Sequence, residues 1–231
     1  MNIYIGFEPK ERLAYDVAKF SILRRSSKTP LIRPIKLRAL QKTIFTRPIE
    51  QKDGRLWCPV SQAPMATEFA ITRFVVPLIQ TYGVALFCDC DIVCLADIKE
   101  LFALADPKYA VQVVKHKHES GPDTKMDGQA QVYYERKNWS SVVLWNCDHP
   151  SNRNLTQEVL NTWPGRDLHA FKWLKDDEIG ELPAEWNQLV GIETGPCKIA
   201  HFTMGGPWLD GWKPAPTDSV WTDELAEMNK K

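Results

Sequence analysis

The most constraining feature of this chain is an apolar run at residues 84–95, VALFCDCDIVCL, that two aspartates interrupt. An apolar run of this length before a polar break is typical of a buried strand. Asp89 and Asp91 follow it at alternate positions, so both can point to one side while Cys90 points away. Two such carboxylates can converge on one divalent cation that prefers oxygen ligands, Mg²⁺ or Mn²⁺. Asp-X-Asp also occurs by chance in solvated loops and helix caps, but such loops rarely lie between two apolar segments.

Length and composition restrict the class of protein. A chain of 231 residues suits one domain of ordinary enzyme size. Its 29 Lys and Arg residues balance 29 Asp and Glu residues, so no charge bias points to nucleic acid or to an anionic membrane. No signal sequence or membrane-length apolar run is evident, so we expect a cytoplasmic protein without a transmembrane segment. The six cysteines include no CxxC pair, so neither a zinc site nor a disulfide framework is expected.

Apolar periodicity predicts alternating strands and helices along the chain, which is typical of an α/β sheet. Pro-rich and polar residues predict a loop at 45–64, a polar stretch is expected at 115–131, and the last dozen residues look loosely attached. The predicted strands are 3–7, 31–37, 84–88, 109–114, 141–145 and 198–202, and the predicted helices are 12–23, 66–82, 98–104, 156–163 and 168–173.

Several polar residues beyond the aspartates are candidates for a site. Arg73 lies on a largely apolar helix, where it must either reach solvent or meet an anion. Asn138 and Ser140 stand at a strand entrance, where their groups could bind sugar hydroxyls, although turn chemistry is the more frequent cause of such clusters. His201 ends a strand just before Gly205 and Gly206, whose backbone N–H groups could approach a phosphate. An imidazole there could complete an Asp/Asp/His set around a metal.

In order, these segments resemble the GT-A glycosyltransferases of family 8, which include glycogenin and bacterial lipopolysaccharide galactosyl- and glucosyltransferases. The resemblance covers about residues 1–210, and its motifs are weak singly but fairly specific in their joint order. The matching segments are Ile3–Gly6, Thr67–Pro77 with Arg73, Asp89–Asp91, Asn138–Ser141, Leu182–Asn187 and His201–Trp208.

The resemblance implies one GT-A nucleotide-diphospho-sugar transferase domain over residues 1–231, with 210–231 as a C-terminal appendage. Its central sheet would be Rossmann-like, mostly parallel and flanked by helices. The implied reaction moves a hexose from a nucleotide-diphosphate sugar to an unidentified sugar or glycan acceptor and retains the anomeric configuration. UDP-hexose is the first candidate for the donor. Substrate specificity would lie in loops 45–64 and 115–137.

The resemblance also implies roles for single residues. Mn²⁺ or Mg²⁺ would be held by Asp91 and His201, with Asp89 shared between metal and ribose. The other donor contacts would come from Gly6, Phe7, Arg73, Asn138, Ser140, Gly205 and Gly206, with Arg73 holding a phosphate or fixing the Asp strand. Asp176 or Asp177 would face the sugar as the catalytic carboxylate.

Two departures from the family pattern affect this assignment. Family members usually carry Lys-Pro-Trp where this chain has Gly206-Pro207-Trp208, so Lys213 or the glycine backbone must serve the diphosphate, or phosphate binding is weaker. The usual Asp-Gln pair appears here as Asp176-Asp177.

Two alternative functions stay open from the sequence. Asp89 and Asp91 match the D-x-D-x-(T/V) motif of haloacid-dehalogenase phosphatases, and Asp176-Asp177 could imitate their late acidic motif. The D-x-D motif usually occupies the first strand of the core, however, whereas a complete strand–helix–strand precedes it here, and the late acidic pair lacks an apolar strand before it. The other alternative is a non-catalytic module of the same fold that binds a nucleotide or a sugar. Sugar nucleotidyltransferases have a similar fold, but their glycine-rich N-terminal phosphate loop is missing.

Overall fold

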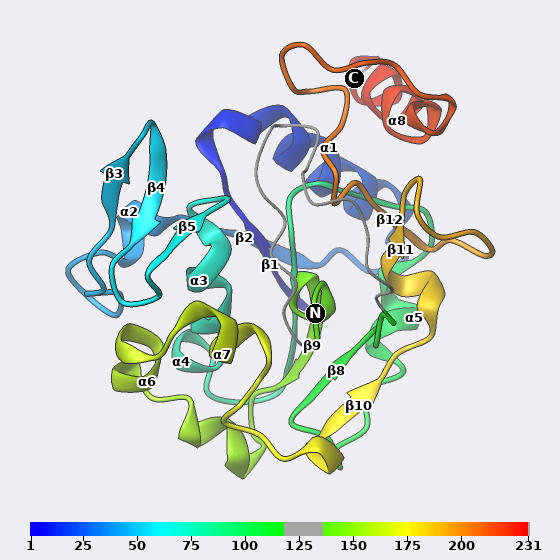
Figure 1. Ribbon diagram of the computed structural model, residues 1–231. Helices are drawn as coiled ribbons and strands as arrows, with labels where there is room; N and C mark the ends of the chain where they lie inside the picture. The colour runs from blue at the N-terminus through cyan, green and yellow to red at the C-terminus, as the bar shows by residue number, and fades with distance from the viewer. Residues whose placement is uncertain (118–135, 231) are drawn as a thin grey trace.

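The computed structural model describes residues 1–117 and 136–230, so most of the predicted polar stretch 115–131 and of the predicted specificity loop 115–137 lies outside the described residues. A six-stranded sheet with the strand order β10-β8-β9-β6-β1-β2 forms the centre of the molecule (Figure 1). Its strands are β1 (Asn2–Gly6), β2 (Leu31–Ile35), β6 (Val84–Cys88), β8 (Val111–Val113), β9 (Val142–Asn146) and β10 (Ile179–Glu181).

The predicted mostly parallel sheet is confirmed. β1 pairs in parallel with β2 and with β6, and β10 pairs in parallel with β8. Only β9 runs against its neighbours β6 and β8 in this sheet. All strands except β9 therefore end at one edge of the sheet, which is where open α/β sheets bind ligands.

Two small sheets flank the central one. The first consists of β7 (Ile92–Cys94), β11 (Gln188–Leu189) and β12 (Ile199–His201). The second consists of β3 (Glu50–Lys52), β4 (Arg55–Cys58) and β5 (Ala63–Met65), so the prediction of a loop at 45–64 is wrong. Asp53 and Gly54 between β3 and β4 both have positive φ, 52° and 74°, which suits a two-residue hairpin turn.

The helices are short apart from the first and the last. The predicted helix 66–82 is interrupted at Arg73–Val75 by a 3₁₀ turn, because Pro77 supplies no backbone N–H to continue the ladder. The predicted helix 168–173 lies earlier and ends before Phe171, whose φ of 53° is left-handed. The helices are α1 (Arg12–Arg25), α2 (Leu37–Leu40), α3 (Phe69–Thr72), α4 (Val76–Ile79), α5 (Ile98–Phe102), α6 (Gln157–Thr162), α7 (Gly165–His169) and α8 (Ser219–Met228).

No helix in the described part of the chain has the length and apolar character that a bilayer crossing requires.

Aromatic side chains pack the segment after α7 against the sheet. The ring of Trp173 stacks on that of Trp145 in β9, with centroids 6.2 Å apart and planes 7° apart. Phe74 meets Trp173 and Phe171 edge-on, at 5.8 and 6.1 Å between centroids. A further edge-on contact, 5.2 Å between the centroids of Phe74 and His169, packs the end of α7 against the same ring.

The expectation that the last dozen residues attach loosely is wrong. α8 lies beside α1 (Figure 1), and its Trp221 is 2% exposed, 5.4 Å from the ring of Trp208. Glu224, also 2% exposed, accepts from Arg24 at 3.1 Å and from Arg25 at 2.7 Å. A buried tryptophan and a doubly paired carboxylate dock this helix onto the domain.

We predict that Trp221→Ala lowers the free energy of unfolding by about 3–5 kcal/mol, because it removes a large buried side chain. The neighbouring exposed Thr222→Ala should change it by less than about 0.5 kcal/mol. Urea unfolding followed by circular dichroism measures both variants. Equal stability of the two variants would contradict the docking of α8 described above.

Candidate functional site

The candidate site lies where β6 ends and β7 begins. Asp89 directly follows β6, and Asp91 directly precedes β7. β7 pairs antiparallel with β12, which sets His201 opposite Ile92. The N–H of Phe202 donates to the carbonyl of Asp91 at 2.9 Å and extends this pairing. Strand pairing therefore carries a histidine from the far end of the chain to the aspartates.

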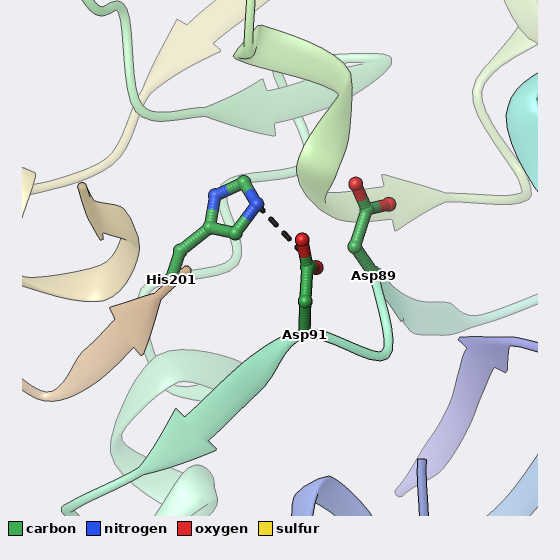
Figure 2. A group of neighbouring side chains, drawn as sticks. All are labelled: Asp89, Asp91 and His201. Atoms are coloured by element: carbon green, nitrogen blue, oxygen red, sulfur yellow. Dashed lines mark ion pairs between the residues drawn. The ribbon is translucent and has the colours of Figure 1, made fainter. Parts of the chain in front are cut away.

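The structure brings together the three residues predicted as metal ligands. One ligand atom from each of Asp89, Asp91 and His201 lies within 4.8 Å of the others, and Figure 2 shows the histidine ring turned toward Asp91. His201 Nε2 is 3.5 Å from Asp91 Oδ1. His201 and Asp89 are 2% and 8% exposed, and the side chain of Asp91 is 19% exposed.

This donor set fits a divalent cation. Two carboxylates and one imidazole suit Mn²⁺ or Mg²⁺, and the imidazole favours Mn²⁺ of the two. The other ring nitrogen of His201, Nδ1, is 3.0 Å from Asn187 Oδ1, which can accept its proton. Such an outer hydrogen bond leaves the Nε2 lone pair directed at the metal position.

Arg73 fixes the Asp89 end of the site. Its Nη1 lies 2.9 Å from Asp89 Oδ1 and donates to the carbonyl of Ser140 at 2.9 Å. The guanidinium lies 5.3 Å from the rings of both Phe69 and Phe87, and Arg73 is 7% exposed. Of the two roles that the resemblance implies for Arg73, fixing the Asp strand agrees with this position.

Asn138 and Ser140 form the turn that enters β9. Asn138 has a left-handed φ of 64°, and its carbonyl accepts from the Ser141 hydroxyl at 2.6 Å. Ser140 is 2% exposed, and its Oγ lies 2.7 Å from His169 Nδ1. Both predicted sugar contacts thus take part in turn chemistry at the edge of the site.

The predicted glycine positions are closely packed. A Cβ on Gly6 would lie 2.5 Å from the ring of Phe69, and one on Gly206 would lie 2.2 Å from the ring of Trp208. Gly205 has a φ of 103°, and its N–H donates to the carbonyl of Phe202 at 2.8 Å. The predicted use of the Gly205 N–H for phosphate therefore competes with this turn hydrogen bond.

Phe7 lies at the end of β1, at the same edge of the sheet as Asp89. Its ring meets Tyr15 edge-on at 5.3 Å, and Lys36 Nζ lies 4.7 Å from its centroid.

Asp176 and Asp177 are not part of the group formed by Asp89, Asp91 and His201. They precede β10, whose first residue, Ile179, pairs with Val111 of β8. Val111 pairs with Trp145 of β9, which in turn pairs with Ala85 near the start of β6. Asp89 follows the opposite end of β6. The Asp176 side chain is 90% exposed and pairs with Arg136. Arg136, two residues before Asn138, links Asp176 to the turn that enters β9, and the catalytic role expected for Asp176 or Asp177 stays a prediction.

Two residues at the site were not predicted to belong to it. Asn187 is quoted in the Leu182–Asn187 segment, but its bond to His201 depends on the pairing of β11 with β12. His169 reaches Ser140 from α7, and no spacing in the sequence signals this contact. Burial, with the nearby Arg73 charge, lowers the pKa of His169 well below its usual range, so its ring is neutral.

We predict strong coupling between Arg73 and Asp89. Arg73→Met should destabilise the metal-free protein by about 3–5 kcal/mol, because it leaves a buried carboxylate without its cation. In the Asp89→Asn background the same substitution should cost about 0.5–3 kcal/mol less. Chemical unfolding of the two single variants and the double variant gives this coupling, and simple additivity would rule out the pairing.

No protein-family model matches the chain. Protein CDI of Arabidopsis thaliana is 44% identical over 238 residues, covering 100% of this chain and 88% of Protein CDI.

The fold is also similar to those of solved glycosyltransferases at low sequence identity. WbbM, a bifunctional glycosyltransferase, has a TM-score of 0.62 at 13% identity, with 98% of this chain and 49% of WbbM covered. GlyE of Streptococcus pneumoniae has 0.61 at 16%, with 99% of this chain and 62% of GlyE covered. The galactosyltransferase LgtC has 0.57 at 11%, with 98% and 96% covered. This chain thus spans about half of WbbM and under two thirds of GlyE.

The sheet order, the position of the aspartates after β6 and these likenesses agree with one another. The chain has the GT-A fold of glycosyltransferases and belongs to the family of Protein CDI.

Proposed function

We propose that the protein is a metal-dependent, retaining glycosyltransferase. It would move a hexose from a nucleotide-diphosphate sugar to a sugar or glycan acceptor, and UDP-hexose is the first candidate for the donor. The observation that carries this proposal is the Asp89, Asp91 and His201 group at the carboxyl edge of a GT-A sheet. A carboxylate pair with an imidazole can hold a divalent cation where open α/β sheets bind nucleotides.

Asp89, Asp91 and His201 would hold Mn²⁺ or Mg²⁺. When bound, the cation supplies Lewis-acid stabilisation of the negative charge that grows on the departing diphosphate. Arg73 keeps the Asp89 carboxylate in one orientation through its 2.9 Å contact and is itself held by the Ser140 carbonyl. A site held in place before the substrate arrives needs little reorganisation during the reaction.

The nucleotide would bind beside the end of β1. Gly6, whose missing side chain makes room for the Phe69 ring, would line this position with its backbone, and the half-buried Phe7 offers an aromatic edge next to the Lys36 ammonium. Gly205 and Gly206 would offer backbone to the diphosphate, and Asn138 and Ser140 would lie near the transferred sugar. Retention requires the acceptor to attack from the side of the leaving group, and Asp176 or Asp177 would be the carboxylate that faces the sugar in that step.

The similar proteins support the class of reaction. WbbM and GlyE are described as glycosyltransferases, and LgtC as a galactosyltransferase bound to donor and acceptor sugar analogues. Those descriptions belong to those proteins. For this chain they favour a nucleotide-sugar donor and a glycan acceptor, and a family 8 assignment agrees with them.

The backbone positions disfavour the phosphatase alternative. It needs Asp176-Asp177 as a late acidic motif beside Asp89 and Asp91, but Asp176-Asp177 precede β10 whereas Asp89 and Asp91 follow the end of β6. The other alternative is a non-catalytic module of the same fold that binds a nucleotide or a sugar. Only a measurement of turnover distinguishes such a module from an enzyme.

We predict that the protein binds UDP far more tightly with Mn²⁺ than with EDTA, because the cation links protein carboxylates to the diphosphate. Asp91→Asn and His201→Ala should each remove most of this difference while keeping the fold. Asp223→Asn, an exposed change on α8, is the matched control. Isothermal titration calorimetry measures the affinities, and equal UDP affinity with and without metal would refute the metal bridge.

We also predict slow hydrolysis of a UDP-hexose without acceptor, and no turnover of simple phosphate esters. Release of UDP should depend on Mn²⁺ and fall at least about 10²-fold in Asp91→Asn, the scale seen when one transition-state stabiliser is removed. A coupled assay for UDP measures this, with p-nitrophenyl phosphate as the second substrate. Rapid ester cleavage that is lost in Asp89→Asn would restore the phosphatase alternative, and metal-dependent UDP binding without any turnover would favour the binding module.

A further inference from the structure

Behind His201, a row of polar side chains leads away from the metal group. After Asn187 come His116, which follows β8, and Glu193, which follows β11. Asn187 Nδ2 is 3.0 Å from His116 Nε2, and His116 Nδ1 is 2.8 Å from Glu193 Oε1. Asn187 is 0% and His116 7% exposed, whereas the Glu193 side chain is 33% exposed. The row thus begins at a buried imidazole and ends at a carboxylate that solvent can reach.

The hydrogen-bond partners determine where each proton lies in this row. Ser141 Oγ donates its proton to the Asn138 carbonyl, so it must accept from Asn187 Nδ2 at 2.9 Å. The Asn187 amide therefore turns its oxygen toward His201, which must carry its proton on Nδ1.

The same argument applies one step further out. The second proton of the Asn187 amide has two acceptors in reach, His116 Nε2 at 3.0 Å and the Asn138 carbonyl at 3.4 Å. The nearer His116 Nε2 accepts it, so His116 carries its proton on Nδ1 and donates to Glu193. The other Glu193 oxygen accepts from the Leu189 N–H at 2.9 Å, which holds the carboxylate in place.

All donors in the row point toward Glu193. If His116 carried its proton on Nε2 instead, two donors would face each other at Asn187. Relief by an amide flip would turn the NH₂ group toward His201 Nδ1 and move the His201 proton to Nε2. His201 would then have no lone pair for a metal.

We propose that Glu193 and His116 are positioning residues for the metal site. Through Asn187 they hold His201 in the tautomer whose Nε2 lone pair faces Asp91. Carboxylates behind metal-binding histidines set ring orientation and basicity in this way, and their loss typically weakens metal binding 10- to 100-fold. Here the carboxylate of Glu193 does not contact His201 directly, because Asn187 and His116 lie between them in the row. The inference rests on the proposed metal site, and its test distinguishes failure of the inference from failure of the metal site.

The test measures two quantities on metal-free protein and on protein titrated with Mn²⁺ alone. Long-range ¹H–¹⁵N NMR of the imidazoles, at a pH above the histidine range, reports which His201 nitrogen is protonated. The His201 signals are assigned by their loss in His201→Ala. Mn²⁺ affinity is measured by electron paramagnetic resonance without nucleotide.

Four variants test the row. His116→Phe removes the acceptor for Asn187, and Glu193→Gln removes the charge and one of two acceptor oxygens. Both should weaken Mn²⁺ binding about 10- to 100-fold and shift His201 toward the Nε2-protonated tautomer. His116→Gln should restore both readouts in large part, because its side-chain oxygen can reach the Nε2 position. Glu181→Gln, at the exposed end of β10, should leave both readouts unchanged.

Unchanged Mn²⁺ affinity with an unchanged tautomer in His116→Phe and Glu193→Gln would overturn the inference. Lost affinity with an unchanged tautomer would overturn it as well, because the damage would then be structural. A wild-type protein that binds no Mn²⁺ would defeat the proposed metal site, whereas the tautomer in the metal-free variants would still decide the role of His116 and Glu193.

Discussion

The burial of a carboxylate at the end of a central strand is the constraint on which this site depends. Asp89 follows β6 and is only 8% exposed, so its charge has lost most of its hydration. A buried charge is tolerated when an opposite charge and hydrogen bonds replace the water. Arg73 supplies both, because its Nη1 contacts Asp89 and the Ser140 carbonyl at 2.9 Å each. The turn that follows α3 and the turn before β9 therefore meet at Asp89.

The break in the helical segment 66–82 also helps to place Arg73 beside Asp89. Pro77 prevents one continuous helix, and Arg73 falls in the 3₁₀ turn between α3 and α4. The aromatic rings of Phe69 and Phe87 enclose the guanidinium, which weakens competition from water. His169 stays neutral beside it and can bond to Ser140 without adding a second positive charge near Asp89. The local charge of the site therefore stays negative, as a divalent cation requires.

The second half of the site is assembled by strand pairing. β12 joins β7 in antiparallel register and β11 in parallel register, so His201 and Asn187 meet beside Asp91. The small three-stranded sheet thus ties the last third of the described chain to the Asp-X-Asp turn. α8 reinforces this, because Trp221 packs near Trp208, just beyond the Gly205-Gly206 turn.

The sequence alone determined the features that local pattern controls. The apolar run 84–88 with its two aspartates predicted β6 and a metal-binding turn, and alternating strands and helices predicted an α/β sheet, which the family resemblance made mostly parallel. The order of weak motifs pointed to a GT-A glycosyltransferase, and it named His201 as the third ligand.

Only the tertiary structure decided which polar residues meet. The resemblance gave Asp176 or Asp177 a catalytic role, but only the parallel pairing of β10 with β8 shows where the segment before β10 lies. Asn187, His169, His116 and Glu193 reach the site through contacts between distant segments, and no local periodicity encodes such contacts. The short strands β3–β5 and the docking of α8 were missed because turn geometry and a few buried side chains hold them. Periodicity reports which face of an element is buried, whereas register and charge compensation decide what that face meets.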